Sequence, residues 1–293
     1  MSRRLFTNRR AMTTSTRRTP PLFSGIGALL SRVFAITPAG TLLDAIKQNQ
    51  IVPFYQPFFD SQTGKIAGIE VLARWKHPLY GHISPDTFIP LAEKYNLIAL
   101  LTHQLIQQVI ADLQHRVQFF PDGLYICLNL SAHNCLDPRF ESDTVELLHK
   151  LDAGQVQVVI EITERHPLHF TPQLSEWFAT LRKSNIAVAL DDFGTGYSNL
   201  SYIHALAPEF IKIDKLFVSQ IDENGDTRLV DSLIELANKM QLRIIAEGVE
   251  TQCQADYLRG KKIDFMQGYH FSRAVHIEEL IRMTMLQKGH TTQ

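Results

Sequence analysis

Residues 186–214, IAVALDDFGTGYSNLSYIHALAPEFIKID, contain the unit from which the fold is predicted. Two apolar runs, Ile186–Asp191 and Phe210–Ile213, are almost continuous in aliphatic side chains, which is typical of strands buried on both faces. An amphipathic segment at 198–206, which we expect to be a helix, lies between them. A strand, a helix and a second strand in this order predict a parallel sheet.

The same alternation runs from residue 51 to residue 287. Strands are expected at 51–60, 66–75, 125–130, 156–163, 243–246 and 265–267 as well. Further helices are expected at 86–119, 138–151, 172–184, 227–241, 251–260 and 276–287. The turn-forming sequence at 61–65 makes the first two strands an antiparallel hairpin. Because the hairpin brings the number of strands to eight, we predict an α/β fold. Its form is a modified (β/α)8 TIM-like barrel with an antiparallel first strand, rather than an open doubly wound sheet.

The bulk composition is that of an ordinary globular protein. The chain has 293 residues, 45% of them hydrophobic, and a net charge of -1. This balance gives no overall field that would attract a nucleic acid polymer or a membrane. Cys127, Cys135 and Cys253 show neither CxxC nor zinc spacing, which favours a reducing, cytoplasmic location.

The first 40 residues differ from the rest. They contain seven arginines, and no acidic residue precedes Asp44. The mildly apolar stretch at 21–36 is interrupted by serines and an arginine, so it is too short and too broken for a transmembrane helix. We interpret residues 1–40 as a basic leader, either disordered or in peripheral contact with the inner membrane. Residues 287–293 are expected to be a polar tail.

Polar side chains follow the apolar part of seven expected strands. A buried charge is costly unless it is paired or metal-bound, and the carboxyl ends of barrel strands converge on one mouth. Carboxylate and amide oxygens suit Mg²⁺ or Mn²⁺ better than zinc, and two adjacent aspartates suit two neighbouring ions acting at phosphorus. These residues are Glu70, Asn129, Glu161, Glu164, Asp191, Asp192, Lys212, Asp214, Glu247, Glu250 and Gln267.

Taken in order, these motifs resemble the EAL-domain family of bacterial cyclic di-GMP phosphodiesterases. They are Glu70-Val71-Leu72, Asn129, Glu161-x-x-Glu164, Asp191-Asp192-Phe-Gly-Thr-Gly-Tyr-Ser, Lys212-Ile-Asp, Glu247-Gly-Val-Glu250 and Gln267-Gly-Tyr. The resemblance covers residues 41–286. Val71 replaces the alanine of the signature tripeptide, and Ala274 stands where such domains often have proline. Neither departure removes an expected ligand, so activity is expected.

The resemblance implies a role for each position. One ion is expected to be held by Glu70, Asn129, Glu161 and Asp191. A second ion is expected at Asp191 and Asp192, with Glu247 close by. Lys212 is implied to act with Glu70 and Asp191 in catalysis by orienting or deprotonating the attacking water. Two nearby cations would lower its proton affinity.

Further positions are implied to contact the substrate or to support a loop. The substrate contacts are expected to be Gln56, Leu72, Arg74 and Gln267. Glu164 and Glu250 are implied to hold the loop after Asp192, which gates metal binding and couples it to a homodimer contact. Plainer readings remain for some residues. Lys212 and Arg74 could form structural ion pairs, and Glu164 and Glu250 could be surface acids.

The expected function is hydrolysis of cyclic di-GMP to linear pGpG with two Mg²⁺ or Mn²⁺ ions, which lowers a bacterial second messenger. The alternative is a catalytically silent regulatory module that binds cyclic di-GMP or a partner protein. A phosphodiesterase for another nucleotide is a third possibility, since the motifs alone do not select the base.

Overall fold

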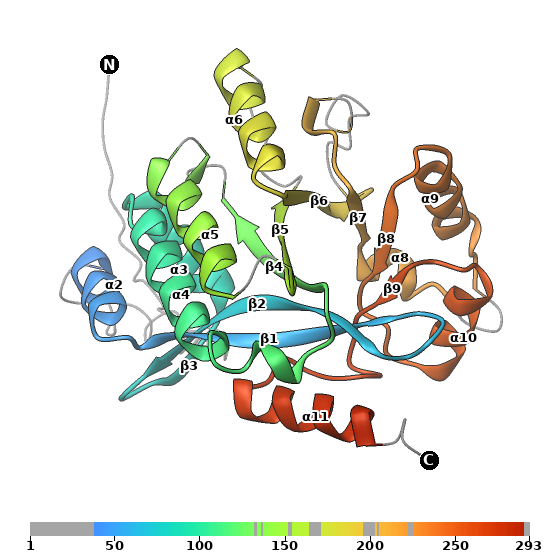
Figure 1. Ribbon diagram of the computed structural model, residues 1–293, viewed down its shortest axis with the longest axis horizontal. Helices are drawn as coiled ribbons and strands as arrows, with labels where there is room; N and C mark the ends of the chain where they lie inside the picture. Colours follow the sequence, from blue (N-terminus) through green and yellow to red (C-terminus); the bar gives the residue numbers. More distant parts are fainter. Residues whose placement is uncertain are drawn as a thin grey trace, which may run out of the picture.

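The computed structural model describes residues 38–131, 134–135, 137–151, 154–163, 171–195, 203, 205–221 and 225–289. All eight expected strands are present and form a closed barrel in the order β1-β9-β8-β7-β6-β5-β4-β2, with β1 paired to β2 (Figure 1). They are β1 (Ile51–Asp60), β2 (Ile66–His77), β4 (Leu124–Leu130), β5 (Val156–Thr163), β6 (Ile186–Phe193), β7 (Phe210–Ile213), β8 (Arg243–Ala246) and β9 (Phe265–Met266).

Strand direction confirms the predicted fold class. β1 is antiparallel to both of its neighbours, β2 and β9. All other pairs around the barrel, from β2–β4 to β8–β9, are parallel. The short β3 (Gly81–Ile83), which was not expected, extends β2 as a hairpin outside the barrel.

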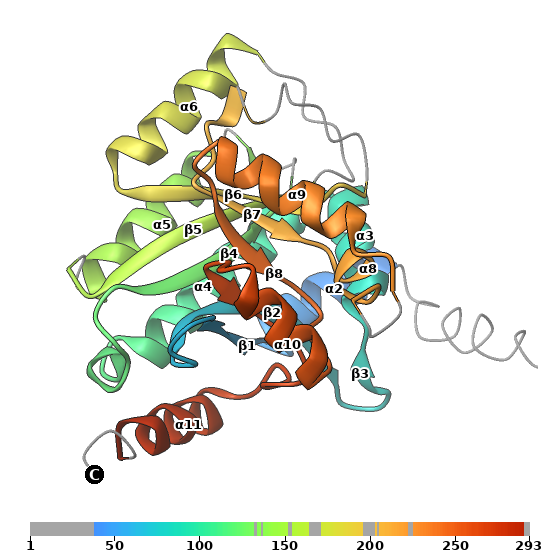
Figure 2. The same ribbon diagram turned by 90° about the vertical axis from the view of Figure 1, so that its right-hand side faces the viewer.

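Helices lie outside the strands. They are α2 (Pro38–Lys47), α3 (Pro85–Lys94), α4 (Ile98–Leu113), the 3-10 turn η1 (Val117–Phe119), α5 (Pro138–Lys150), α6 (Pro172–Lys183), α8 (Lys215–Val218), α9 (Arg228–Lys239), α10 (Gln252–Gly260) and α11 (Ile277–Gly289). Figures 1 and 2 show α11 beside β1. No helix in the described part of the chain is long and apolar enough to cross a bilayer.

The single helix expected over 86–119 is wrong. The chain forms α3, α4 and η1 there, and the break between α3 and α4 lies at Asn96, which adopts a left-handed φ of 54°. Asparagine tolerates this conformation better than most residues, and it ends an α-helix. The expected helix at 198–206 falls mostly outside the described residues, as do the leader up to residue 37 and the last four residues.

Apolar side chains pack on both faces of the barrel strands. One layer lies between the strands and the helices, and the other fills the barrel. Barrel-filling side chains include Cys127, Phe210 and Phe265, and Cys127 is completely buried. Because side chains alternate along each strand, residues two positions apart share the interior of the barrel.

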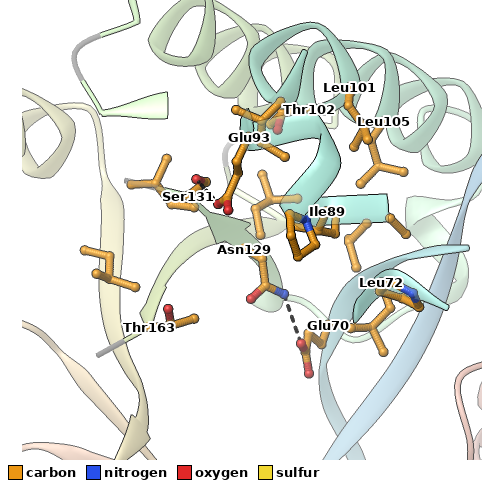
Figure 3. Close-up of a pocket in the computed structure, with 18 of the residues that line it drawn as sticks. Glu70, Leu72, Ile89, Glu93, Leu101, Thr102, Leu105, Asn129, Ser131 and Thr163 are labelled. Carbon is orange, nitrogen blue, oxygen red and sulfur yellow. Dashed lines mark hydrogen bonds between the residues drawn. The ribbon is translucent and has the colours of Figure 1, made fainter. Parts of the chain in front are cut away.

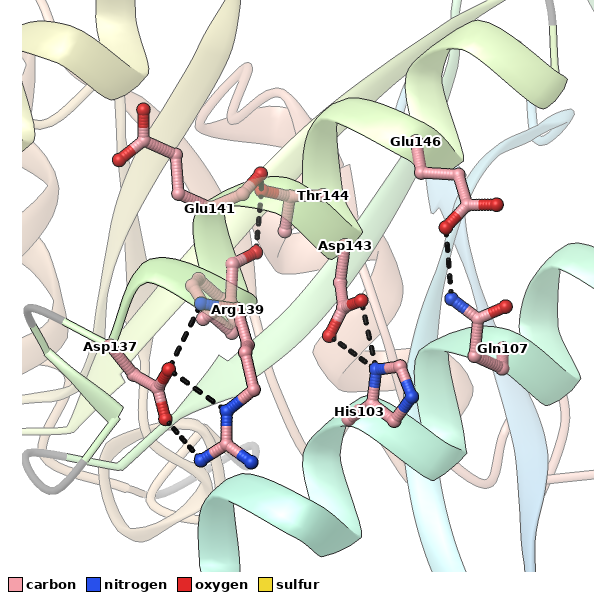
Figure 4. A network of polar contacts seen from close by, with 9 residues as sticks. His103, Gln107, Asp137, Arg139, Glu141, Asp143, Thr144 and Glu146 are labelled. Carbon is pink, nitrogen blue, oxygen red and sulfur yellow. Dashed lines mark hydrogen bonds and ion pairs between the residues drawn. The ribbon is translucent and has the colours of Figure 1, made fainter.

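Polar contacts join α4 to α5 on the outside of the barrel (Figure 4). His103 Nδ1 lies 2.9 Å from both carboxylate oxygens of Asp143, and Gln107 Nε2 donates to Glu146 Oε2 at 3.1 Å. These pairs fix the two helices against each other above β4 and β5.

Candidate functional site

The alternation within each strand positions the polar side chains. Val159 belongs to the interior of the barrel, while Ile160 and Ile162 pack toward the helices. Glu161, two residues after Val159, therefore points into the barrel at its mouth. Asn129 pairs with Glu161 in the parallel register of β4 and β5, so the two side chains reach the same level.

Lys212 is the centre of the mouth. Its side chain is 1% exposed, and its Nζ atom contacts four carboxylates. Nζ lies 2.7 Å from Glu247 Oε1, 2.9 Å from Glu161 Oε2, 3.4 Å from Glu70 Oε2 and 3.5 Å from Asp191 Oδ1. Strands β2, β5, β6 and β7 and the end of β8 thus converge on one ammonium group.

Two amide side chains orient Glu70. Asn129 Nδ2 donates to Glu70 Oε1 at 3.1 Å, and Gln267 Nε2 donates to Glu70 Oε2 at 2.7 Å. Figure 3 shows the nitrogen of Asn129 turned toward Glu70 and its oxygen turned away. The expected residues from the second, third and eighth strands of the barrel therefore meet.

Burial and crowding shift the pKa of each group. Burial raises the pKa of Glu161 well above its usual value, although Lys212 opposes this. Burial also raises the pKa of Glu247 to about 8. For Glu70, burial is outweighed by Lys212 and by hydrogen bonds from the two amides, so its pKa is lowered.

The carboxylates around Lys212 set the pKa of its amine. Burial lowers its pKa, but Asp191, Glu161 and Glu247 together raise it well above the usual value. The carboxylates around the amine are the reason, because their charge stabilises the ammonium form. The plainer reading of Lys212 as an ion-pair partner is thus part of its structural role.

The donor set fits divalent cations. Oxygen atoms of Asp191, Asp192 and Glu247 lie within 4.8 Å of one another. Glu161 Oε1 and Gln267 Oε1 are buried and have no hydrogen-bond partner. Carboxylate and amide oxygens of this kind are ligands for hard cations, and an unpartnered buried carboxylate oxygen is costly without one.

The turn at Asp191 and Asp192 places the two carboxylates side by side. Asp192 has a left-handed φ of 54°, and its backbone N–H donates to Asp191 Oδ1 at 2.9 Å. Aspartate is among the residues that tolerate this conformation, and such strained positions cluster at functional sites.

A cavity of about 410 Å³ opens beside this cluster (Figure 3). Glu70, Leu72, Arg74, Asn129 and Asp192 line its side toward the mouth. Its apolar wall comes from α3 and α4. Sequence reasoning missed this wall, because helical periodicity does not distinguish a pocket lining from an ordinary core. The wall residues include Ile89, Pro90, Leu101 and Leu105.

Gln56 and Arg74, two of the expected substrate contacts, hydrogen-bond to backbone carbonyls. Gln56 lies opposite Glu70 in the β1–β2 register, and its Nε2 donates to the Ser272 carbonyl at 3.3 Å. No carboxylate within the described residues pairs with Arg74, whose Nη1 donates to the Ala73 carbonyl at 2.9 Å. The structural ion pair that was the alternative for Arg74 is therefore not found there.

The expected loop support is described only in part. Glu250 is exposed, and its backbone N–H donates to Gln254 Oε1 at 2.7 Å near the start of α10. Glu164 and residues 196–202 lie outside the described residues. Asp214 caps α8 by accepting from the Leu216 N–H at 2.7 Å, so it has a structural role.

A closed α/β barrel with an acidic, cation-suited centre at its carboxyl-end mouth defines a class of metal-site barrel proteins. Residues 39–274 match the family model of the EAL domain. The chain therefore belongs to the EAL domain family, as the motifs predicted.

Two curated relatives agree with this family assignment. The chain is 41% identical over 260 residues to the probable cyclic di-GMP phosphodiesterase PdeG of Escherichia coli (strain K12), covering 88% of the chain and 51% of PdeG. It is 43% identical over 256 residues to the cyclic di-GMP phosphodiesterase PdeL of the same organism, covering 87% of the chain and 70% of PdeL. The chain thus spans only about half the length of PdeG.

Two solved structures have the same fold. The PaMucR phosphodiesterase in complex with c-di-GMP superposes with a TM-score of 0.73 at 28% identity, covering 82% of this chain and 98% of that one. The EAL enzyme Bd1971 in its cAMP-bound form gives a TM-score of 0.75 at 26% identity, covering 90% and 74%.

Proposed function

We propose that the chain is a divalent-metal phosphodiesterase that hydrolyses one phosphodiester of cyclic di-GMP to linear pGpG. The observation that carries this proposal is the convergence of four carboxylates on buried Lys212. This cluster borders a cavity that also contains Arg74. The names of PdeG and PdeL, and the c-di-GMP complex of PaMucR, support the choice of substrate.

The proposed ions are two Mg²⁺ or Mn²⁺. One would be held by Glu70, Asn129, Glu161 and Asp191. The other would be held by Asp191 and Asp192, with Glu247 close by. When bound, the ions would activate water and neutralise charge that develops at phosphorus. The acidic oxygens and the unpartnered Glu161 Oε1 support this assignment.

The protein side chains have separate proposed tasks. Lys212, fixed by its carboxylate partners, would orient the attacking water as an ammonium donor, and would accept its proton only where bound cations lower the proton affinity of the amine. Arg74 would bind a phosphate through its planar guanidinium, because no carboxylate among the described residues already occupies it. Gln56, Leu72 and Gln267 would hold the rest of the nucleotide.

We also propose a homodimer in which Glu164 and Glu250 support the loop after Asp192. A cytoplasmic location with peripheral contact at the inner membrane, through the leader at 1–40, belongs to the same proposal. Sedimentation with anionic vesicles should recover the full chain and leave a chain without residues 1–40 in solution. Equal recovery of both would contradict the membrane contact.

A turnover assay tests the main proposal. Purified protein with cyclic di-GMP and Mg²⁺ or Mn²⁺ should yield pGpG, and Glu70→Ala should abolish the product. Glu235→Ala, which removes an exposed carboxylate on α9, is the matched control and should leave turnover unchanged. Binding without turnover in excess metal would instead support the regulatory module. Faster cleavage of another cyclic dinucleotide would reassign the substrate.

A further inference from the structure

The β1–β2 ribbon continues outward from the metal centre. Glu70, Leu72, Arg74 and Lys76 alternate along β2, so their side chains share one face. Directly opposed residues of β1 share the same face, and Phe54 pairs with Leu72 just as Gln56 pairs with Glu70. Each step of two residues advances about 7 Å along the strand. Phe54 and Lys76 therefore lie beyond the mouth on the face that carries Glu70.

On this face, basic side chains surround the ring of Phe54. Lys76 Nζ lies 5.1 Å and Arg74 Cζ lies 6.0 Å from the centroid of this ring. The ring of His276 lies 4.1 Å from the ring of Phe54, and Lys76 Nζ donates to His276 Nε2 at 2.8 Å. The backbone bonds between Tyr55 and Val275 hold His276 in place beside β1.

Among the described residues, the basic side chains around Phe54 form no ion pair with a carboxylate. Neither Arg74 nor Lys76 has a carboxylate within 4.0 Å in the described part of the chain, whereas Lys239 and Lys261 each have one. A ring attracts a cation without neutralising it or occupying its N–H donors. Asp112, an acid on the other side of β1, is engaged elsewhere, because it accepts a hydrogen bond from the Tyr55 hydroxyl at 2.6 Å. The side chains of Arg74 and Lys76 are therefore held in place and available to bind an anion.

We propose that Lys76, positioned by Phe54 and His276, forms a second anion subsite that holds a phosphate of the nucleotide away from the metal centre. The identity of the nucleotide rests on the proposed function. Arg74 joins the subsite to the cavity, because it lines the cavity and also faces Phe54. The chemistry is the attraction of an ammonium and a guanidinium to phosphate oxygens, outside a mouth whose own residues are mainly acidic.

Exchanging Lys76 for methionine tests the subsite. Lys76→Met removes the charge and keeps most of the stem. Lys94→Met is the matched control, because Lys94 Nζ lies 5.6 Å from the ring of Tyr95 on exposed α3. We expect Lys76→Met to raise KM for cyclic di-GMP roughly threefold to fivefold and to leave kcat unchanged. The difference should shrink at high salt. An unchanged KM, or the same change in Lys94→Met, would overturn the subsite.

Equilibrium binding separates this proposal from the proposed function. Cyclic di-GMP is titrated into each protein in EDTA, where no turnover is required. Weaker binding by Lys76→Met than by wild type supports the subsite even if wild type never yields pGpG, and equal affinity refutes it. Lys76→Arg should restore affinity, and His276→Ala should weaken it less than Lys76→Met. An effect of His276→Ala on kcat alone would contradict its positioning role.

Discussion

Each end of the barrel holds one cation: Lys212 at the mouth is buried among carboxylates, whereas Arg243 at the floor is part-exposed, lies against aromatic rings and has its Nε 3.6 Å from Asp264 Oδ1. At the mouth, four carboxylates contact Lys212. At the floor, the guanidinium of Arg243 lies 5.0 Å, 5.1 Å and 4.7 Å from the ring centroids of Tyr125, Phe210 and Phe265. Phe210 and Lys212 are only two residues apart on β7.

The two ends of the barrel have different roles: the floor stabilises the fold, and the mouth carries the proposed chemistry. At the floor, Arg243 also donates to the Tyr125 hydroxyl, and the rings of Phe210 and Phe265 are almost fully buried. Gly68 makes room for this packing, because a Cβ there would lie 2.1 Å from Phe58 Cζ. Apolar burial of this kind stabilises the fold. At the mouth, crowded buried carboxylates oppose folding unless cations compensate them.

The largest effect is expected from Lys212→Met, which removes the compensating charge from the mouth. Three or more buried carboxylates would then lack a cation, so we expect a loss of about 3–5 kcal/mol in the free energy of unfolding. Urea unfolding in EDTA measures it, and turnover should also be lost. Lys215→Met, an exposed neighbour on α8, is the control. An unchanged urea midpoint for Lys212→Met would break the comparison.

Phe210→Ala makes the corresponding change at the floor. Deleting this ring, which is 1% exposed, should cost about 3–5 kcal/mol by leaving a cavity. The kcat of the folded fraction should stay near that of wild type, because the ring of Phe210 packs against the rings of Tyr125 and Phe265 at the floor. Leu229→Ala, at an exposed position on α9, serves as the comparison for stability. A large fall in kcat at full folding would show that the two ends are coupled.

Divalent cations should stabilise the mouth and leave the floor unaffected. Mg²⁺ or Mn²⁺ at a hundredfold excess over Kd should add about 2.7 kcal/mol per site to the free energy of unfolding. Phe210→Ala should keep this increment, and Asp191→Asn should lose most of it. Urea midpoints with and without metal provide the measurement. An equal gain in Asp191→Asn would place the binding elsewhere.

The last test concerns pH. Burial raises the pKa of Glu247 from 4.5 to about 8, although Lys212 opposes the shift. Because the folded pKa exceeds the unfolded one, the protonated form favours folding, and its stabilisation is lost as pH rises from about 4.5 to 8. In EDTA, Glu247→Gln should therefore lose less stability than wild type between pH 5 and pH 8. Parallel pH curves would contradict the assignment.

Much of the mouth followed from local sequence. Period-two alternation and parallel direction fix which residue of a strand reaches the carboxyl end, so Glu161, Asp191 and Lys212 were predicted to meet. The hairpin at 61–65 likewise indicated an antiparallel first strand. The break at Asn96 was not anticipated, because helical periodicity continues on both sides of it.

The sequence by itself determined the barrel, its first strand and the identities of the acidic and amide side chains at the mouth, because these depend on periodicity and on motifs within each strand. Only the tertiary structure decided that Lys212 is held by four carboxylates, that α3 and α4 wall the cavity and that His276 lies against Phe54 and Lys76. Those contacts join residues up to 222 positions apart, and their distances depend on barrel closure and packing, which no local pattern records.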